Sequence, residues 1–267
     1  GEREEKLHNP AQLSFQVGKC TDRGRVREQN QDSFLTLESI FQREGNSLPF
    51  GLFIVADGLG GEEKGEKASS LAIKVVAQHI LLQVYFPLLA PEEEGSPARP
   101  INEALTIATE EANRIVYEKI PEAATTLTAA LLLGDTAYIA HVGDSRAYFI
   151  RRGTIKQITH DHSLVARLVE LGQVSPEEAL NHPQRNYLYR ALGKAGTLEV
   201  DIYSQPLLSE SHLLLCSDGL WSMVQDEEIL QIISSASHPQ EACSSLVEVA
   251  NKHGGEDNIT AILISVI

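Results

Sequence analysis

Short strand-like segments that alternate with pairs of amphipathic helices restrict the folds available to this sequence. Strands are predicted at Leu13–Thr21, Ser33–Leu37 and Gly51–Ala56, and long amphipathic helices at Lys67–Tyr85 and Ile101–Lys119. Further strands are predicted at Thr126–Leu133, Ala137–His141, Arg146–Ile150, Ile155–Gln157, Leu213–Cys216 and Ile259–Ile267. Sheets and helices must each bury an apolar face, so this order predicts an α+β fold in which two packed sheets are covered by helices.

Turn and capping residues define the segments between these elements. Gly134-Asp135 and Arg152-Gly153 predict hairpin turns. The stretch Phe86–Pro100 contains four prolines and three consecutive glutamates, which predicts a solvated loop. His160–Gly193 is predicted to be helical, polar and irregular, with a helix starting at Ser175. Two more helices are predicted at Asp226–Ser234 and Gln240–His253.

The balance of charges argues against nucleic acid as a partner. The chain of 267 residues has 22 Lys and Arg against 37 Asp and Glu, giving a formal net charge of -15. Binding to duplexes depends on cationic contacts to phosphates, so this acidic chain is not expected to bind them. An acidic protein can still hold a phosphate group where bound cations invert the local field.

Length, cysteines and hydropathy indicate the setting of the protein. With about 150 residues per domain as a guide, we expect a single domain over residues 13–267 after a disordered tail at residues 1–12. Cys20, Cys216 and Cys243 are odd in number and widely spaced, which favours a reducing, cytoplasmic setting without a disulfide framework. The best apolar stretch, Leu71–Leu89, is interrupted by polar residues and a proline, so membrane insertion is not expected.

Aspartates stand next to several of the predicted strands. Asp32 and Asp257 precede Ser33–Leu37 and Ile259–Ile267, whereas Asp57, Asp144 and Asp218 follow Gly51–Ala56, Ala137–His141 and Leu213–Cys216. In an antiparallel sheet the end of one strand lies beside the start of its neighbour, so these carboxylates can meet at one rim. Such a cluster repels itself unless cations occupy it, and oxygen ligands favour Mg²⁺, Mn²⁺ or Ca²⁺. One such acid alone is more often a turn residue than a ligand; their joint order indicates the site.

Arg27 is the candidate partner for an anion at this rim. It precedes Asp32 by five residues in a polar, turn-rich segment. A guanidinium beside a metal cluster can hold a phosphoryl group through two parallel hydrogen bonds. An arginine in such a segment is more often a solvated surface residue, and Arg23 and Arg25 keep that interpretation.

Six ordered sequence blocks resemble the type 2C protein phosphatases, metal-dependent serine/threonine phosphatases, in their compact bacterial form. The resemblance runs from about Val17 to Ile267. The blocks are Thr21-Asp22-Arg23-Gly24 through Arg27-Glu28-Gln29-Asn30-Gln31-Asp32-Ser33, Val55-Ala56-Asp57-Gly58-Leu59-Gly60-Gly61, Thr125-Thr126-Leu127-Thr128-Ala129-Ala130, His141-Val142-Gly143-Asp144-Ser145-Arg146, Ser217-Asp218-Gly219-Leu220-Trp221 and Glu256-Asp257-Asn258-Ile259-Thr260.

The resemblance implies a central sandwich of two antiparallel sheets flanked by helices, with a dinuclear Mn²⁺ or Mg²⁺ centre at one end. It implies that Asp57 bridges the two ions, orients the water and shares one site with Asp218 and Asp257. The Gly58 carbonyl and a water held by Asp32 complete the other site. Asp144 with Asp218 matches positions that hold a weaker third ion, and Arg27 matches the phosphate-binding arginine. Residues 160–193 resemble the flap beside the active site.

Two departures from the family pattern bear on the chemistry. Some members have a histidine after the Asp-Gly pair, proposed as the general acid, where this chain has Leu59. His162 in the flap is an alternative acid, although packing of the flap is the more ordinary role. Many members also have Glu where this chain has Gln31, which removes one negative charge near the second ion.

The resemblance implies hydrolysis of phosphoserine and phosphothreonine in proteins by a metal-activated water, without a phosphoenzyme intermediate. The partners would be phosphorylated proteins, a serine/threonine kinase among them, and we expect a monomer. A catalytically silent relative that binds metal or phosphoprotein is the alternative.

Competing hydrolase chemistries fit the spacing less well. No cysteine is followed six positions later by the arginine of a cysteine-based phosphatase. Calcineurin-like enzymes match only at Thr21-Asp22-Arg23-Gly24, without their histidine ligands at matching places. The segment around Ser145 lacks the closing glycine of a nucleophile elbow, so a turn hydrogen bond is its expected role.

Overall fold

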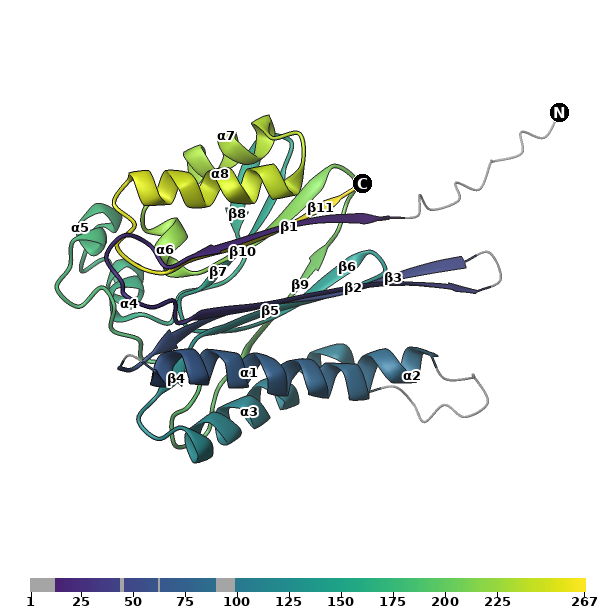
Figure 1. Ribbon diagram of the computed structural model, residues 1–267, viewed down its shortest axis with the longest axis horizontal. Coiled ribbons are helices and arrows are strands. Elements are labelled where there is room, and N and C mark those ends of the chain that lie inside the picture. Colours follow the sequence, from purple (N-terminus) through teal and green to yellow (C-terminus); the bar gives the residue numbers. More distant parts are fainter. Residues whose placement is uncertain (1–12, 44–45, 62, 90–98) are drawn as a thin grey trace.

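Two antiparallel sheets lie between two layers of helices (Figure 1). The computed structural model describes residues 13–43, 46–61, 63–89 and 99–267. This arrangement confirms the predicted helix–sheet–sheet–helix sandwich. The tail predicted at residues 1–12 lies outside the described residues.

The first sheet joins the two ends of the described chain. In spatial order it contains β1 (Phe15–Asp22), β11 (Ile259–Val266), β10 (Ser211–Cys216), β7 (Arg146–Arg151) and β8 (Thr154–Gln157). All neighbours are antiparallel. Strand β11, between β1 and β10, is buried along its whole length, which explains why its sequence is a continuous apolar run rather than an alternating one.

The second sheet contains two strands that were not predicted. Its order is β2 (Asp32–Arg43), β3 (Asn46–Leu59), β5 (Leu127–Leu133), β6 (Thr136–Val142) and β9 (Asp201–Pro206), with β4 (Ala124–Thr125) paired to the end of β3. Strand β9 pairs only with β6 in this order and carries polar residues and a terminal proline. Such residues are tolerated on an edge strand, and they hide the hydrophobic pattern of a strand.

The core between the two sheets is apolar. Phe53, Ile139, Leu213 and Ile262 come from strands of both sheets and are completely buried there. Each sheet also packs against its own helices through one further apolar cluster. The rigid sandwich therefore fixes the strand ends on which the aspartates are placed.

Helices cover the outer face of each sheet. The second sheet is covered by α1 (Lys64–Ile80), a π-helical turn η1 (Leu81–Tyr85), α2 (Phe86–Leu89) and α3 (Ile101–Lys119); the first is covered by α7 (Asp226–Ser235) and α8 (Pro239–Lys252). Helix α6 (Asp218–Trp221) and helices α4 (Leu164–Glu170) and α5 (Pro176–Leu180) lie at one end of the sandwich (Figure 1).

The stretch Lys64–Leu89 is long and apolar enough to cross a membrane by length and composition, because an 18-residue window within it has a mean hydropathy of 1.5. One such helix is weak support for a span, because a helix in the core of a protein passes the same test. Ala72, Val76 and Ile80 on α1 are completely buried in the cluster beneath the second sheet. This packing accounts for the apolar face of the helix.

Three local predictions were wrong. Residues 86–89 of the predicted loop continue the preceding helix as α2. Most of 160–193 is not helical; only α4 and α5 form there, the latter with the predicted capping box at Ser175. The predicted strand Gly51–Ala56 was too short, because β3 continues through Asp57 and Gly58 to Leu59, where it pairs with β4. The predicted hairpin turns are confirmed by positive φ values at Gly134 and Gly153.

Candidate metal and phosphate site

The five predicted aspartates meet at one end of the sandwich. Asp32 and Asp57 are directly paired residues of β2 and β3 in the second sheet. Asp218 begins α6 after β10, and Asp257 comes just before β11, so both adjoin strands of the first sheet. Asp144 lies between β6 and β7 and so connects the two sheets. Burial and then the negative charges of the other four raise the pKa of Asp57, so each of the other four carboxyls lies within electrostatic reach of Asp57.

Burial makes these carboxyls poor anions in the absence of a cation. Burial, followed by the charges of neighbouring aspartates, raises the pKa of both Asp57 and Asp218 well above the usual range. Burial also raises the pKa of Asp32 to about 6 and that of Asp144 to about 7. Clustered buried acids of this kind either hold protons or share cations.

Two oxygens of the cluster have no partner in the protein. Asp32 Oδ1 and Asp218 Oδ1 are buried, and neither forms a hydrogen bond. A buried carboxylate oxygen without a partner loses the free energy of its hydration, so native proteins rarely leave one unsatisfied. Both oxygens therefore fit a site completed by a divalent cation or its water ligands.

The oxygen ligands suit magnesium or manganese, which keep some of their waters, rather than an ion enclosed by protein ligands alone. Within residues 13–43, 46–61, 63–89 and 99–267, no three His, Cys, Asp or Glu side chains converge tightly enough to enclose an ion by themselves. The site implied by the resemblance, with Asp57, Asp218 and Asp257 on one ion, therefore requires these side chains to move closer together when the ion binds, and waters would complete its coordination. The fit is supported by the orphaned oxygens and the raised pKa values.

Hydroxyl groups from the first sheet fix the orientation of Asp32. Ser217 Oγ and Thr260 Oγ1 donate to Asp32 Oδ2 at 2.7 and 2.6 Å. These two bonds hold Oδ2 in place. The other oxygen, Oδ1, has no partner in the protein and is left for the cluster. Neither hydroxyl was singled out from the sequence, although both belong to the blocks that carry the family resemblance.

Arg27 lies beside the cluster, as predicted. Its Nη2 donates to Asp257 Oδ2 at 2.7 Å, and its side chain is 52% exposed. This hydrogen bond, opposed by partial burial, raises the pKa of Arg27, and the charges of Asp218 and Asp57 also contribute. The guanidinium can therefore face an anion at the rim while remaining next to the acids.

Asn258 holds the segment that carries Arg27. Its Nδ2 donates to the carbonyls of Arg23 and Gln29, at 2.9 and 2.8 Å, and its Oδ1 accepts from the amide of Gln31 at 2.8 Å. The side chain is 4% exposed. One buried amide thus ties the polar segment before β2 to the start of β11, where Asp257 stands.

Gly58 lies where the backbones of β3 and α1 approach each other. A Cβ at this position would be 2.1 Å from the Gly65 carbonyl oxygen and 2.8 Å from that of Gln31. The Gly58 amide donates to the Gln31 carbonyl at 3.2 Å. Only glycine fits this contact, which holds the backbone that follows Asp57 against Gly65 and Gln31.

The peptide that carries Asp144 is fixed from several sides. Trp221 Nε1 donates to the Asp144 carbonyl at 2.9 Å. The Arg146 guanidinium stacks on the Trp221 ring at 3.6 Å and makes two-pronged hydrogen bonds to Asp161. Ser145 Oγ lies 2.8 Å from Thr126 Oγ1. Ser145 is buried, and its hydroxyl bonds to a residue 19 positions away rather than within a turn, so it is not an exposed nucleophile.

His162 is a packed side chain rather than an acid exposed to the cleft. It is 2% exposed, and both ring nitrogens are within hydrogen-bond distance of protein atoms. Burial lowers the pKa of His162. The structure thus favours the packing role for His162. Leu59 stands on β3 where some family members have histidine.

The other candidate chemistries find no site in the described residues. Asp22 Oδ1 accepts from the amide of Gly24 and from Asn251 Nδ2, so the calcineurin-like motif forms a turn. Cys216 and Cys243 are buried free thiols, and burial raises their pKa values.

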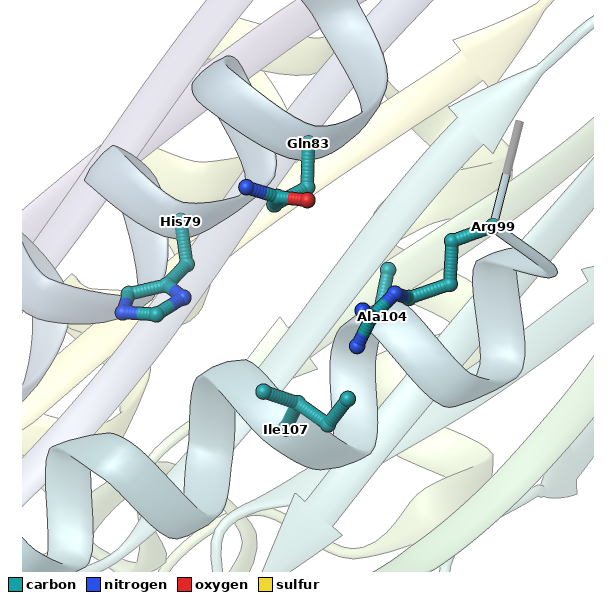
Figure 2. A pocket seen from close by; sticks show the side chains of 5 residues that line it. All are labelled: His79, Gln83, Arg99, Ala104 and Ile107. Atoms are coloured by element: carbon teal, nitrogen blue, oxygen red, sulfur yellow. The ribbon is translucent and has the colours of Figure 1, made fainter. Parts of the chain in front are cut away.

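One hollow of the described surface lies away from these aspartates. It is lined by His79, Gln83, Arg99, Ala104 and Ile107 and lies between the helical segment α1–η1 and the start of α3 (Figure 2). None of the predicted site residues belongs to it.

Comparison with known families agrees with this geometry. The family model described as "Protein phosphatase 2C" matches residues 22–263. The chain belongs to the protein phosphatase 2C family. This match confirms the family and enzyme class predicted from the sequence.

Individual members of the protein phosphatase 2C family resemble the chain over nearly its whole length. The serine/threonine phosphatase stp of Listeria welshimeri is 38% identical over 250 residues, 91% of this chain and 93% of that protein. The structure of the S. agalactiae serine/threonine phosphatase matches with a TM-score of 0.79 and 30% identity, covering 95% of this chain and 100% of that one. The catalytic domain of the phosphatase PstP, solved with two manganese ions, matches with a TM-score of 0.76 and 30% identity, covering 96% and 99%.

Proposed function

We propose that this protein hydrolyses phosphoserine and phosphothreonine in other proteins with the help of Mn²⁺ or Mg²⁺. The observation that carries the proposal is the meeting of five aspartates at one rim, with buried oxygens of Asp32 and Asp218 unpartnered and Arg27 alongside. The manganese-bound structure of a relative supports the choice of cation.

The proposed ligand roles divide between the two sheets. Asp57 would be a ligand of both ions, Asp218 and Asp257 would complete one site, and the Gly58 carbonyl with a water held by Asp32 would complete the other. Asp144, with Asp218, would hold a weaker third ion. When bound, the cations would lower the pKa of a water and neutralise charge on the phosphoryl group.

The side chains of the protein supply orientation and charge. Arg27 holds the phosphoryl oxygens through its fork of donors, and its contact with Asp257 keeps the guanidinium at the rim. Ser217 and Thr260 orient Asp32. The buried thiols, Ser145 and His162 offer no exposed nucleophile, which supports direct attack by water without a phosphoenzyme. With Leu59 after Gly58, the proton for the leaving alkoxide comes from water.

The proposed setting follows from the same features. Phosphorylated proteins are the partners, a serine/threonine kinase among them, and nucleic acid is not. We propose a cytoplasmic monomer with one catalytic domain over residues 13–267, in which residues 160–193 form the flap.

The proposal is tested by hydrolysis of a phosphothreonine peptide and of p-nitrophenyl phosphate. Activity should require Mn²⁺ or Mg²⁺, disappear in EDTA and return when metal is restored. Acid quenching of a single turnover should trap no phosphorylated protein. Activity that persists in EDTA contradicts the mechanism, and absence of activity at every metal concentration favours the catalytically silent alternative.

A further inference from the structure

The loop between β6 and β7 is in contact with the first residues of the flap segment, 160–193. His162 belongs to this segment, and its main-chain N–H donates to the Gly143 carbonyl at 2.7 Å. The Gly143 N–H donates in return to His162 Nδ1 at 3.0 Å. One residue of the flap segment therefore satisfies both polar groups of Gly143, the residue directly before Asp144.

The His162 ring cannot turn away from this contact without losing several others. Because Nδ1 accepts from Gly143, Nε2 carries the proton and donates to Asp201 Oδ2 at 3.1 Å, and Arg190 Nη1 in turn donates to Asp201 Oδ1 at 2.8 Å. The rings of His141 and Tyr189 pack near it, with centroid distances of 4.9 and 5.8 Å. The ring is thus fixed on both nitrogens and by its aromatic neighbours, so the position of Nδ1 is defined by groups outside the loop.

The backbone at Gly143 needs such support. Gly143 has φ of 111°, and a Cβ there would lie 2.6 Å from Thr126 Cγ2. One peptide further along the chain, Trp221 Nε1 donates to the Asp144 carbonyl at 2.9 Å. The backbone that carries Asp144 is therefore held between a histidine of the flap segment and a tryptophan of α6.

We propose that His162 is a positioning residue for Asp144 and acts through the hydrogen bond between its Nδ1 and the Gly143 amide. The flap segment and Asp144, the proposed ligand of the weaker ion, then move as one unit. The proposal rests on the proposed function, in which Asp144 binds the weaker ion. It assigns His162 a role in metal affinity rather than in proton transfer. Outer-shell contacts of this kind change metal affinity by about 10- to 100-fold.

A matched pair of variants separates the two ring nitrogens. In His162→Asn the amide oxygen can occupy the place of Nδ1 and accept from Gly143, whereas in His162→Gln the amide reaches the place of Nε2. Both variants lose the ring and its stacking. A role in packing alone predicts equal effects, but the proposed role predicts that only His162→Gln releases Gly143.

The measurement is Mn²⁺ binding, followed by the electron paramagnetic resonance signal of free Mn²⁺, with melting temperatures recorded to establish that both variants fold. We expect the dissociation constant of the weakest ion to rise about 10-fold or more in His162→Gln, and to stay close to the wild-type value in His162→Asn. Equal changes in the two variants, or no change in either, would overturn the proposal. Wild-type protein that binds no Mn²⁺ would instead refute the proposed function.

The wild-type protein gives a second measurement if either variant fails to fold. Titration with Mg²⁺ should shift the ¹⁵N resonances of the His162 ring and of the Gly143 amide. Both shifts should have the same midpoint as the binding of the weakest ion. His212, which bonds to Ser265 at 2.8 Å on β10 and β11, is the internal control and should not shift. A His162 ring that stays unchanged while the Gly143 amide moves would contradict the coupling.

Discussion

Asp32 and Asp57 are paired residues across β2 and β3, so two carboxyls stand side by side at a buried sheet edge. Pairing of like charges at such a position is destabilising. The fold tolerates it because Ser217 and Thr260 donate to Asp32 from the opposite sheet, and because cations can share the remaining oxygens.

This pairing predicts an unusual dependence of stability on pH. Burial raises the pKa of Asp32 to about 6 and that of Asp144 to about 7, above the ordinary value of about 4 expected in the unfolded chain. The folded state then binds protons more tightly, so these groups make the metal-free protein less stable as the pH rises through that interval. Saturating Mn²⁺ should remove the loss, because it binds the ionised, folded form.

The measurement is thermal unfolding in EDTA and in Mn²⁺ between about pH 5 and pH 8. We expect the melting temperature in EDTA to fall across this range and the stabilisation by Mn²⁺ to increase. A metal-free protein that becomes more stable toward pH 8 would show that the aspartates are not clustered as described.

Thr260→Val tests the support of Asp32. The change keeps the shape of the side chain but removes the hydroxyl that donates to Asp32 Oδ2 at 2.6 Å. We expect about 10-fold weaker Mn²⁺ binding, the lower end of the range for outer-shell changes, and little loss of fold. Ser265→Ala, which removes a hydroxyl from the same strand near its other end, is the control. Equal affinities for Mn²⁺ in the two variants would show that Thr260 does not support the metal site.

Arg27→Ala should lower kcat/KM for a phosphopeptide by about 10- to 100-fold, since hydrogen bonds to charged groups contribute about 1.5–3 kcal/mol. A rise in KM alone would assign Arg27 to binding of the ground state, and a fall in kcat to the transition state. Arg27→Lys keeps the charge without the fork and should recover only part of the loss. Arg23→Ala, an exposed neighbour in the same segment, is the control. Kinetics unchanged in Arg27→Ala would refute its role.

Gly58→Ala should destabilise the protein and weaken metal binding together. The new methyl group would meet the Gly65 carbonyl at 2.1 Å, and overpacking of this kind costs about 1–3 kcal/mol. Gly61→Ala is the matched control, because a Cβ there meets nothing within 4 Å. Chemical unfolding and Mn²⁺ titration of both variants give the comparison. A Gly58→Ala protein as stable as Gly61→Ala would contradict the close approach of β3 and α1.

Periodicity was sufficient to predict most elements of the fold, because strands such as β5 and helices such as α1 carry strong apolar patterns. It failed for β9, whose polar sequence pairs at an edge, and for residues 160–193, where capping and turn residues resemble those of longer helices. Neither segment has the apolar repeat on which such predictions depend.

The aspartates of the candidate site could be predicted from the sequence, but the side chains that hold them and the neighbouring backbone in place could not. Aspartates at strand ends can be recognised because antiparallel pairing brings such ends together. The hydroxyl of Thr260 and the amide of Asn258 look like ordinary polar side chains until the register of β11 is known. The link from His162 to Gly143 spans 19 residues of chain, and no local pattern indicates it.

The most direct test of the account is a manganese-edge anomalous difference map from crystals soaked in Mn²⁺. The account predicts peaks for two strong ions, one of them within bonding distance of Asp57, Asp218 and Asp257, and none at that position in Asp218→Asn. Peaks that lie away from these carboxylates, or wild-type crystals that take up no manganese while remaining active, would contradict the metal site on which the proposed chemistry depends.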